Sequence, residues 1–339
     1  MTAASPLLGV LVISTGGIAN GSFAVPSKRI AHWSWEHIWL IYCLVALAVL
    51  PMGLAAVFAP ALYADVFPHN PVLVGQVFGF GSLWGVGALL FGISLARLGI
   101  AISNALVSGT VVLFGSLGPL MIGAAKLSAS DLLRLSVGLL LLVCGIVITG
   151  RASVERDRLA SPRQVVMLGA GSWTGVLLAV FGGALSSMLN IGFAYGAPLV
   201  EQAKRAGVTP LASGLAIWTP ALFGGCILNS VFTSRRIHRA GSWGKFMDSG
   251  AGAWLRSSSM GLLWFGAILL YGIGASALGS AGTVYGWAII TGVSILTSSA
   301  WGLATGEWAS AHRARKMMYL SVGFILSAFL VLASRGATG

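Results

Sequence analysis

Long apolar runs separated by short polar breaks dominate the chain. Ten runs are long enough to be membrane spans, because about 20 apolar residues in an α-helix cross the hydrocarbon core of a bilayer. They cover residues 7–25, 36–58, 72–95, 100–123, 132–150, 165–189, 210–232, 255–275, 282–304 and 317–333. The pattern predicts an all-α integral membrane protein with ten transmembrane helices.

The composition fits a chain that lies mostly in lipid. Hydrophobic residues make up 57% of it and charged residues only 8%, whereas a soluble domain is about 25% charged. The mean hydropathy is +0.90. Glycine is frequent, with 47 residues, and small residues let membrane helices pack closely. The cysteines Cys43, Cys144 and Cys226 lie within apolar runs and are expected to be buried, small hydrophobic residues.

Positive charges are unevenly distributed among the connections between the spans. Fifteen of the twenty Lys and Arg residues lie in or beside the odd-numbered connections: Lys28, Arg29, Arg97, Arg151, Arg156, Arg158, Arg163, Arg235, Arg236, Arg239, Lys245, Arg256, Arg313, Arg315 and Lys316. The even-numbered connections and the tail hold the other five: Lys126, Arg134, Lys204, Arg205 and Arg335. Because positive residues stay on the cytoplasmic side, the odd connections are expected inside the cell and both termini outside.

The net charge of +12 would suggest a nucleic-acid partner for a soluble chain. Here the basic residues lie in short loops, where they orient the protein and contact the headgroups of the lipid bilayer, so no nucleic acid is expected. No Lys or Arg precedes the first apolar run, unlike in a secretory signal peptide. That run is therefore expected to be retained, in a multi-pass protein of a bacterial-type plasma (inner) membrane.

One stretch of the chain recurs 180 positions later. Residues 83–101 read LWGVGALLFGISLARLGIA and residues 263–281 read LWFGAILLYGIGASALGSA. Nine aligned pairs are identical: Leu83/Leu263, Trp84/Trp264, Leu89/Leu269, Leu90/Leu270, Gly92/Gly272, Ile93/Ile273, Leu98/Leu278, Gly99/Gly279 and Ala101/Ala281. Arg97 aligns with Ala277. This loss of charge is expected if the third span ends inside the cell and the eighth ends outside.

A second repeat relates the first span to the sixth. The letters GVL at residues 9–11 and GG at 16–17 recur as GVL at 175–177 and GG at 182–183. Five spans per half turn the second half upside down, as in the inverted repeats of secondary transporters. The predicted organisation is a first five-helix repeat at 1–150, a cytoplasmic linker at 151–163 and a second five-helix repeat at 164–339. Chance similarity between apolar segments is the alternative.

Several short motifs follow one another in the order found in a known family. They are His32-Trp33-Ser34-Trp35-Glu36 with Trp39, Leu83-Trp84-Gly85-Val86-Gly87, Phe91-Gly92, Arg97-Leu98-Gly99, Gly175-Val176-Leu177-Leu178-Ala179-Val180, Ala197-Pro198-Leu199-Val200-Glu201-Gln202-Ala203, Gly261-Leu262-Leu263-Trp264 and Gly306-Glu307-Trp308. With these motifs the chain resembles the L-rhamnose/proton symporter family of the drug/metabolite transporter superfamily. The resemblance spans the whole chain, and its specificity comes from the common order of the motifs.

The resemblance implies ten helices in a five-plus-five inverted repeat and uptake of a monosaccharide with protons. We therefore predict secondary active transport by alternating access, with a sugar such as L-rhamnose and protons as partners and without a cofactor. The same scaffold also suits an exporter or facilitator of another small metabolite. A non-transporting membrane receptor is a further alternative.

Three carboxylates are candidates for proton coupling or gating. A proton symporter needs a titratable group that faces water or substrate in turn, and intramembrane carboxylates usually supply it. Of the eight Asp and Glu residues, Glu36, Glu201 and Glu307 lie beside the ends of spans, and none lies in the middle of a span. Glu36 and Glu201 hold similar places in the two halves. A favourable interaction with a helix dipole, without a role in transport, is the alternative for these two.

Sugar binding requires flat apolar faces and a few hydrogen-bonding groups. Trp84 and Trp264 lie well inside the third and eighth spans at equivalent positions of the repeat, so they are the predicted stacking pair. Asn20, Asn104 and Asn190 are costly in lipid and are predicted to bind the substrate. Packing between helices is the alternative for the tryptophans, and hydrogen bonding between helices for the asparagines. Six other tryptophans are expected at the membrane interface: Trp33, Trp35, Trp39, Trp243, Trp254 and Trp308.

An enzyme or an ATP-driven pump is not expected. The five histidines lie in or beside loops and are mostly far apart, so no metal site is predicted. The sequence GSWGKF at residues 241–246 lacks both the glycine spacing and the Ser or Thr of a phosphate-binding loop.

Overall fold

The computed structural model describes residues 6–160 and 173–333, and nearly all of these residues are helical. Ten helical segments are long and apolar enough to cross a membrane: Pro6–Arg29, Trp35–Phe58, Pro71–Leu95, Ala101–Met121, Ala129–Leu159, Trp173–Arg205, Pro210–Arg239, Ala251–Ala277, Gly282–Ala304 and His312–Ala333. The ten predicted spans are thereby confirmed, and the described part of the chain contains no strand. The protein is an all-α, multi-pass membrane protein.

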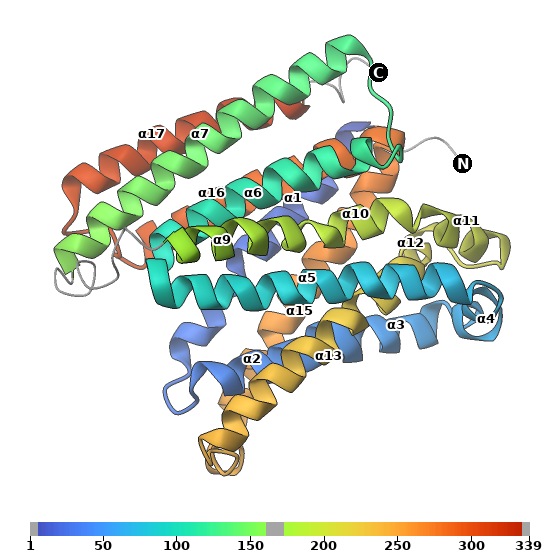
Figure 1. Ribbon diagram of the computed structural model, residues 1–339, viewed down its shortest axis with the longest axis horizontal. Coiled ribbons are helices and arrows are strands. Elements are labelled where there is room, and N and C mark those ends of the chain that lie inside the picture. The colour runs from blue at the N-terminus through green and yellow to red at the C-terminus, as the bar shows by residue number, and fades with distance from the viewer. Residues whose placement is uncertain (1–5, 161–172, 334–339) are drawn as a thin grey trace.

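Eight of the spans are built on one main helix each (Figure 1). These helices are α1 (Pro6–Ser22), α5 (Pro71–Leu98), α6 (Ile100–Met121), α7 (Ala129–Ala160), α13 (Leu215–Arg239), α15 (Ala251–Ala277), α16 (Gly282–Ala304) and α17 (His312–Ala333). Short elements lie in the connections: the 3₁₀ turns Val25–Arg29 and Gly279–Ala281, the π turn Leu62–Val66, α4 (Phe67–His69), α12 (Pro210–Ser213) and α14 (Lys245–Asp248). Since α7 continues to Ala160, most of the predicted linker at 151–163 is helical, and residues 161–163 lie outside the described residues.

The second span is divided by a proline. It consists of α2 (Trp35–Leu44), a π turn at Val45–Val49 and α3 (Leu50–Phe58). Pro51 has no N–H to donate to the carbonyl four residues earlier, and the helix widens immediately before it, with Leu50 N–H bonded to Val45 O. Such π turns are common where a helix accommodates a local irregularity.

The sixth span is longer than predicted. It consists of α9 (Trp173–Ser186), α10 (Met188–Tyr195) and α11 (Ala197–Arg205), with breaks at Ser187 and Gly196. The predicted end at residue 189 was wrong, because Asn190 finds partners inside the bundle and the helical run therefore continues beyond it. Residues 165–172 of the predicted span lie outside the described residues.

The first helix of each half packs on the third and fourth helices of the other half. α1 contacts α15 and α16, and α9 contacts α5 and α6. The contacts repeat at the level of residues: Gly16 of α1 packs against Leu270, and Gly182 of α9 packs against Leu90. Leu90 and Leu270 are separated by 180 positions, the offset of the sequence repeat. These contacts join residues that the two sequence repeats align.

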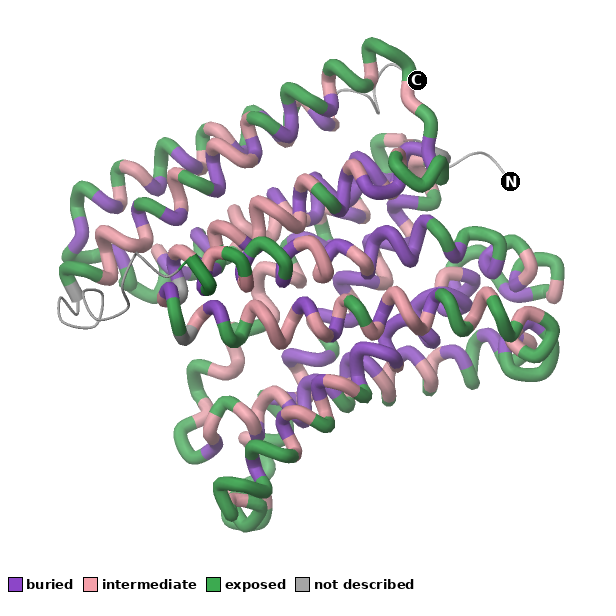
Figure 2. Tube along the Cα trace, in the orientation of Figure 1, coloured by how far each residue is buried: buried purple, intermediate pink, exposed green. Residues whose placement is uncertain are grey.

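The connections rich in Lys and Arg lie together at one end of the bundle, which we name the basic end. Figure 1 shows the ends of α7 and α13 and the start of α17 there, whereas α4, α11 and α12 lie at the opposite end. The interior is most enclosed around α13: 72% of the apolar core of its span is buried, compared with 28% for the span of α17 at the edge. Figure 2 shows this contrast between α13 and the outer pair α7 and α17.

Candidate functional site

The two predicted stacking tryptophans lie face to face at the centre of the bundle. Trp84 is in the middle of α5 and Trp264 is in the middle of α15. Their ring centroids are 5.4 Å apart and the ring planes differ by 26°. The indole ring of Trp84 also packs against the backbone of α13 at Gly225. A Cβ atom at this position would come within 2.5 Å of the ring, so only glycine fits there. Each tryptophan thus covers one face of the other.

An aromatic layer continues from this pair toward the basic end. Tyr42 of α2 is buried and meets Trp264 edge-on, with ring centroids 6.1 Å apart. Trp39 Nε1 donates a hydrogen bond of 3.2 Å to Asn229 Oδ1, and Asn229 Nδ2 donates one of 3.0 Å to Gly225 O. Trp39 was expected at the membrane interface, but its indole N–H turns toward α13 because a buried amide oxygen is available there.

Asn190 forms a polar centre that joins four helices. It is fully buried in α10, and its Nδ2 atom donates hydrogen bonds of 2.7 Å to Gly115 O in α6 and 2.8 Å to Thr283 O in α16. Its Oδ1 atom accepts a hydrogen bond from the hydroxyl of Tyr271 in α15. The carbonyl of Gly115 is free to accept because the residue four positions later, Pro119, has no N–H. Every hydrogen-bonding group of the amide is thereby used.

Tyr271 was not among the predicted site residues, although the sequence contained a signal. It is fully buried, and the distance from its hydroxyl oxygen to Thr283 O is 3.4 Å. In the aligned repeat its partner is Phe91, so the second half has gained a hydroxyl in the middle of an apolar helix. A buried hydroxyl requires a partner, and the position therefore pointed to a polar contact between helices.

A cavity of about 320 Å³ opens at the opposite end, and one of its lining residues is Thr283, whose backbone oxygen accepts a hydrogen bond from Asn190. Its walls come from α10, α11, α15 and α16, and include Phe193, Glu201, Lys204, Ser276 and Thr283. The Glu201 and Lys204 side chains form an ion pair of 2.7 Å and are partly exposed. The volume falls at the lower end of the range for small-molecule sites, about 300–1,000 Å³. Apolar walls with a few polar groups suit a small polar ligand.

A buried tryptophan lies beneath the cavity wall with an unused donor. The ring of Phe193 stacks on Trp218 of α13, with centroids 4.5 Å apart and planes 12° apart. Trp218 is fully buried, and its Nε1 atom has no hydrogen-bond partner among the described residues. A buried N–H without a partner is costly, and the Nε1 atom lies against α15, where a side-chain carbon at Gly272 would come within 2.8 Å of it.

The other two predicted asparagines lie away from the cavity. Asn20 of α1 is half-buried, and its Nδ2 atom donates a hydrogen bond of 2.9 Å to Ser294 Oγ in α16. Asn104 is exposed in the first turns of α6, near the basic end. None of the three predicted asparagines lines the cavity, and Asn190 is connected to it through Thr283, whose backbone oxygen accepts a hydrogen bond from Asn190.

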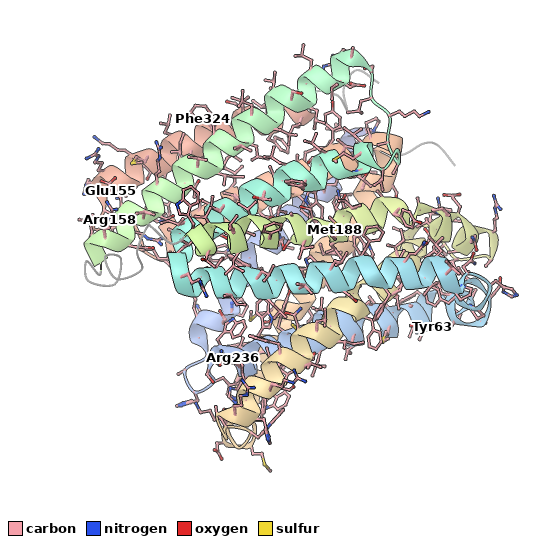
Figure 3. All side chains as sticks on the ribbon, in the orientation of Figure 1. Tyr63, Glu155, Arg158, Met188, Arg236 and Phe324 are labelled. Carbon is pink, nitrogen blue, oxygen red and sulfur yellow. The ribbon has the colours of Figure 1, made fainter. Side chains whose placement is uncertain are left out.

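The three predicted carboxylates are divided between the two ends. Glu201 lies on the cavity wall at the opposite end. Glu36 lies at the start of α2 at the basic end, where its Oε1 atom is 2.7 Å from Nη2 of Arg236 at the end of α13. Glu307 also lies at the basic end, in the connection between α16 and α17, and its carboxylate pairs with Lys28 and with Arg156. Figure 3 marks Arg236 at this end.

The charges around Glu307 determine its ionisation. Partial burial raises the pKa of its carboxyl group, but the hydrogen bond from Lys28 and the positive charges of Lys28 and Arg156 lower it by more, so the pKa lies below its ordinary value. Trp308 beside it is buried, and the guanidinium of Arg156 lies 4.7 Å from its ring centroid. Glu307 is therefore a charged link between connections.

No group of three or more His, Cys, Asp or Glu side chains in residues 6–160 and 173–333 is arranged to hold a metal ion. What the described residues offer instead is a set of aromatic rings in the middle of the spans, one buried amide centre and a cavity that adjoins this centre through Thr283. This is the arrangement of a polytopic membrane protein that binds a small molecule within the bilayer.

The comparison with protein families gives the family. The model of the family described as L-rhamnose-proton symport protein (RhaT) matches residues 1–335, and the chain belongs to that family. The resemblance found in the sequence is thereby confirmed, and the family is one of transporters and not of enzymes.

Curated relatives agree over nearly the full length. The chain is 24% identical over 328 residues to the L-rhamnose-proton symporter of Klebsiella pneumoniae (strain 342), with 94% of each chain covered. It is 25% identical over 328 residues to the protein of that name from Enterobacter sp. (strain 638), again with 94% of each covered. For an Escherichia coli symporter the identity is 24% over 329 residues, with the same coverage. Together with the ten apolar helices, these relatives indicate a multi-pass inner-membrane protein.

Proposed function

We propose that this protein takes up a monosaccharide, L-rhamnose, together with protons by alternating access. The observation that carries the proposal is the family match over residues 1–335, with relatives named L-rhamnose-proton symporter that align along 94% of their length. A cavity that adjoins a buried polar centre through Thr283 supports it, because such a site suits a small polyhydroxylated ligand within the membrane.

The proposal includes an inverted relation between the two halves, with the basic end in the cytoplasm and both termini outside. The distribution of Lys and Arg supports this orientation. The equivalent packing of Gly16 on Leu270 and of Gly182 on Leu90 supports a repeat of structure. In this orientation the cavity faces outward and the basic end is closed, so the conformation is the one that receives substrate from outside.

We place the sugar between the cavity and the tryptophan pair. The indole N–H of Trp218 has no partner among the described residues, and the Asn190 amide and the Tyr271 hydroxyl would exchange their present hydrogen bonds for bonds to sugar hydroxyls. Trp84 and Trp264 remain the proposed stacking pair. A sugar ring would stack on one of the two indole faces that now contact each other. For Asn20 and Asn104 a role in binding stays a prediction, since neither lines the cavity.

We assign different roles to the three carboxylates. Glu201 lies on the wall of the outward cavity, so it is the proposed group that takes up a proton from outside. Glu36 and Glu307 are ion-paired at the basic end, and they are the proposed gate that must open to release the sugar. Release of these pairs costs little in water, which suits a gate that opens in each cycle.

The test is a sugar panel followed by transport. We expect L-rhamnose to raise the melting temperature of the purified protein more than other monosaccharides do. In proteoliposomes with an acidic exterior it should accumulate, and a protonophore should abolish accumulation. Failure of L-rhamnose in both assays would overturn the substrate, and accumulation that is indifferent to the protonophore would overturn the coupling.

The tryptophan pair gives a sharper test of the binding site. Trp264→Ala should abolish the thermal shift caused by the sugar, because it removes one of the two stacking faces. Trp173→Ala is the matched control, since Trp173 is 79% exposed at the start of α9. An undiminished shift in Trp264→Ala would exclude the proposed stacking, and Trp264→Phe should retain part of the shift if a flat ring is what the sugar requires.

A further inference from the structure

A second cavity, of about 720 Å³, lies at the basic end between α6, α7 and α17. It shares no lining residue with the cavity of the proposed sugar site. Figure 3 marks two of its residues, Glu155 and Arg158, at the end that α7 shares with the start of α17. The function proposed above gives this cavity no role.

The cavity has an apolar part and a charged part. Its apolar walls include Ile102 and Leu106 of α6, Val147 of α7 and Met317 of α17. These residues belong to the ends of long apolar runs, so they lie at the level of the hydrocarbon. The charged lining residues of α7 follow its apolar run, and the charged lining residue of α17 precedes the apolar run of that helix. Both positions are at the level of the lipid headgroups.

The charged part is strongly positive. Arg151, Glu155 and Arg158 follow one another on one face of α7, since residues about four and seven positions apart lie on the same side of a helix. Arg313 of α17 joins them, and its Nε atom is 3.6 Å from Glu155 Oε1. Arg151 and Arg158 form no ion pair with any described residue. The lining of the cavity therefore carries three guanidinium groups and one carboxylate.

We propose that this cavity binds an anionic phospholipid, with the phosphate between Arg151 and Arg158 and an acyl chain along Leu106 and Met317. Guanidinium groups form strong, paired hydrogen bonds to phosphate oxygens, and basic pockets between helices at the cytoplasmic side bind anionic headgroups. A soluble anion would use only the charged part. The continuous apolar wall below it selects a molecule that carries both a phosphate and a hydrocarbon chain.

The site is tested by lipid titration of the purified, full-length protein, with bound lipid counted by native mass spectrometry. Phosphatidylglycerol should bind more tightly than phosphatidylcholine. Arg151→Gln combined with Arg158→Gln should weaken phosphatidylglycerol binding about 30-fold, because each basic residue near the membrane contributes about 1 kcal/mol. Arg235→Gln combined with Arg239→Gln removes the same charge from exposed positions of α13 at the same end, and should change binding less than twofold.

Three outcomes would overturn the proposal. They are equal binding of the two lipids, an affinity of the Arg151→Gln/Arg158→Gln protein within twofold of wild type, and an equal loss in the Arg235→Gln/Arg239→Gln control. Glycerol phosphate that competes as well as phosphatidylglycerol would also overturn it, because the ligand would then be a soluble anion.

Glu155→Gln provides a test of opposite sign. It removes the one carboxylate of the cavity and frees Arg313 from its ion pair, so phosphatidylglycerol binding should tighten about fivefold, in proportion to one charge near the membrane. This variant keeps the test decisive if the double arginine variant does not fold. Weaker binding in Glu155→Gln would contradict the proposed electrostatics.

Discussion

The two ends of the helix bundle are held together in different ways. At the basic end, ion pairs join elements far apart in the chain: Lys28–Glu307, Arg156–Glu307, Glu36–Arg236 and Glu155–Arg313. At the opposite end, the ion pairs of the described residues lie within about one helical turn: Asp65–His69, Asp131–Arg134 and Glu201–Lys204. An ion pair within one turn does not resist the separation of two helices, whereas a pair between distant helices does.

Hydrogen bonds to the connection between α13 and α15 strengthen the basic end further. Trp33 Nε1 donates a hydrogen bond of 3.1 Å to Lys245 O. His37 is fully buried, and its Nε2 atom is the donor in a hydrogen bond of 2.9 Å to Ser242 O, since a carbonyl can only accept. This connection therefore folds over the start of α2. The comparison teaches that long-range ion pairs and hydrogen bonds tie α2, α13 and the connections together at the basic end, whereas the ion pairs of the described residues at the opposite end tie no two distant helices.

The largest expected change in stability comes from Asn190→Ala. The substitution leaves Gly115 O without a donor and removes the main acceptor of the Tyr271 hydroxyl, at a cost of about 1–3 kcal/mol for each stranded group. Thermal unfolding measures the loss. Asn104→Ala is the matched control, because Asn104 is exposed and its truncation should change the stability by less than about 0.5 kcal/mol. Equal melting temperatures of the two variants would show that the polar centre does not hold the four helices together.

Glu36→Gln should weaken the closed end specifically. It removes a charge-assisted pair between α2 and α13, worth up to about 1 kcal/mol, so the population open at the basic end should rise about fivefold. Cys226 reports this opening, because it is 4% exposed and packs against Cys43 O between the same two helices. Its reaction with a maleimide should accelerate about fivefold.

Asp65→Asn is the control for that experiment, since it changes a side-chain contact between Asp65 and His69 that lies within one turn at the opposite end. The labelling rate of Cys226 should stay at the wild-type value in this variant. An unchanged rate in Glu36→Gln, or an equal increase in Asp65→Asn, would remove the distinction between the two ends.

Acidification should loosen the basic end through Glu307. Because the folded protein lowers the pKa of this carboxyl group, the ionised form contributes stability above the pKa of the unfolded chain, about 4.3 for an ordinary glutamate. That contribution is lost as the pH falls through the lower, folded-state pKa. The difference in melting temperature between wild type and Glu307→Gln should therefore be constant at neutral pH and shrink in acid. A difference that persists at low pH would contradict the role of the Lys28 pair.

The sequence predicted the features that the bilayer itself imposes. The ten spans could be read directly, because a backbone in hydrocarbon must form long helices and the residues around it must be apolar. Asn190 could be found for the same reason, since an amide in an apolar run has to be satisfied by other helices. Arg97 and its missing counterpart at Ala277 indicated which span ends lie on the basic side.

The partners of these residues could not be predicted, because they depend on packing between helices far apart in the chain. The sequence does not indicate that Trp39 forms a hydrogen bond to Asn229 or that Trp84 packs against Gly225. Trp33 was expected at the interface and is buried, since the connection after α13 supplies the carbonyl that its N–H requires. Aromatic residues are favoured both at the membrane interface and in cores, so composition alone does not separate the two locations.

The smallest expected change in stability, and the sharpest test of the open end, comes from Glu201→Gln. The Glu201 side chain is 61% exposed and pairs only with Lys204 in its own helix, so its loss should cost less than about 0.5 kcal/mol. If Glu201 takes up the proton, the variant should lose sugar accumulation driven by a pH gradient while sugar exchange across the membrane continues. Accumulation at the wild-type ratio would instead leave Glu201 as a surface charge on the cavity wall, and the coupling group would have to be sought at the closed end.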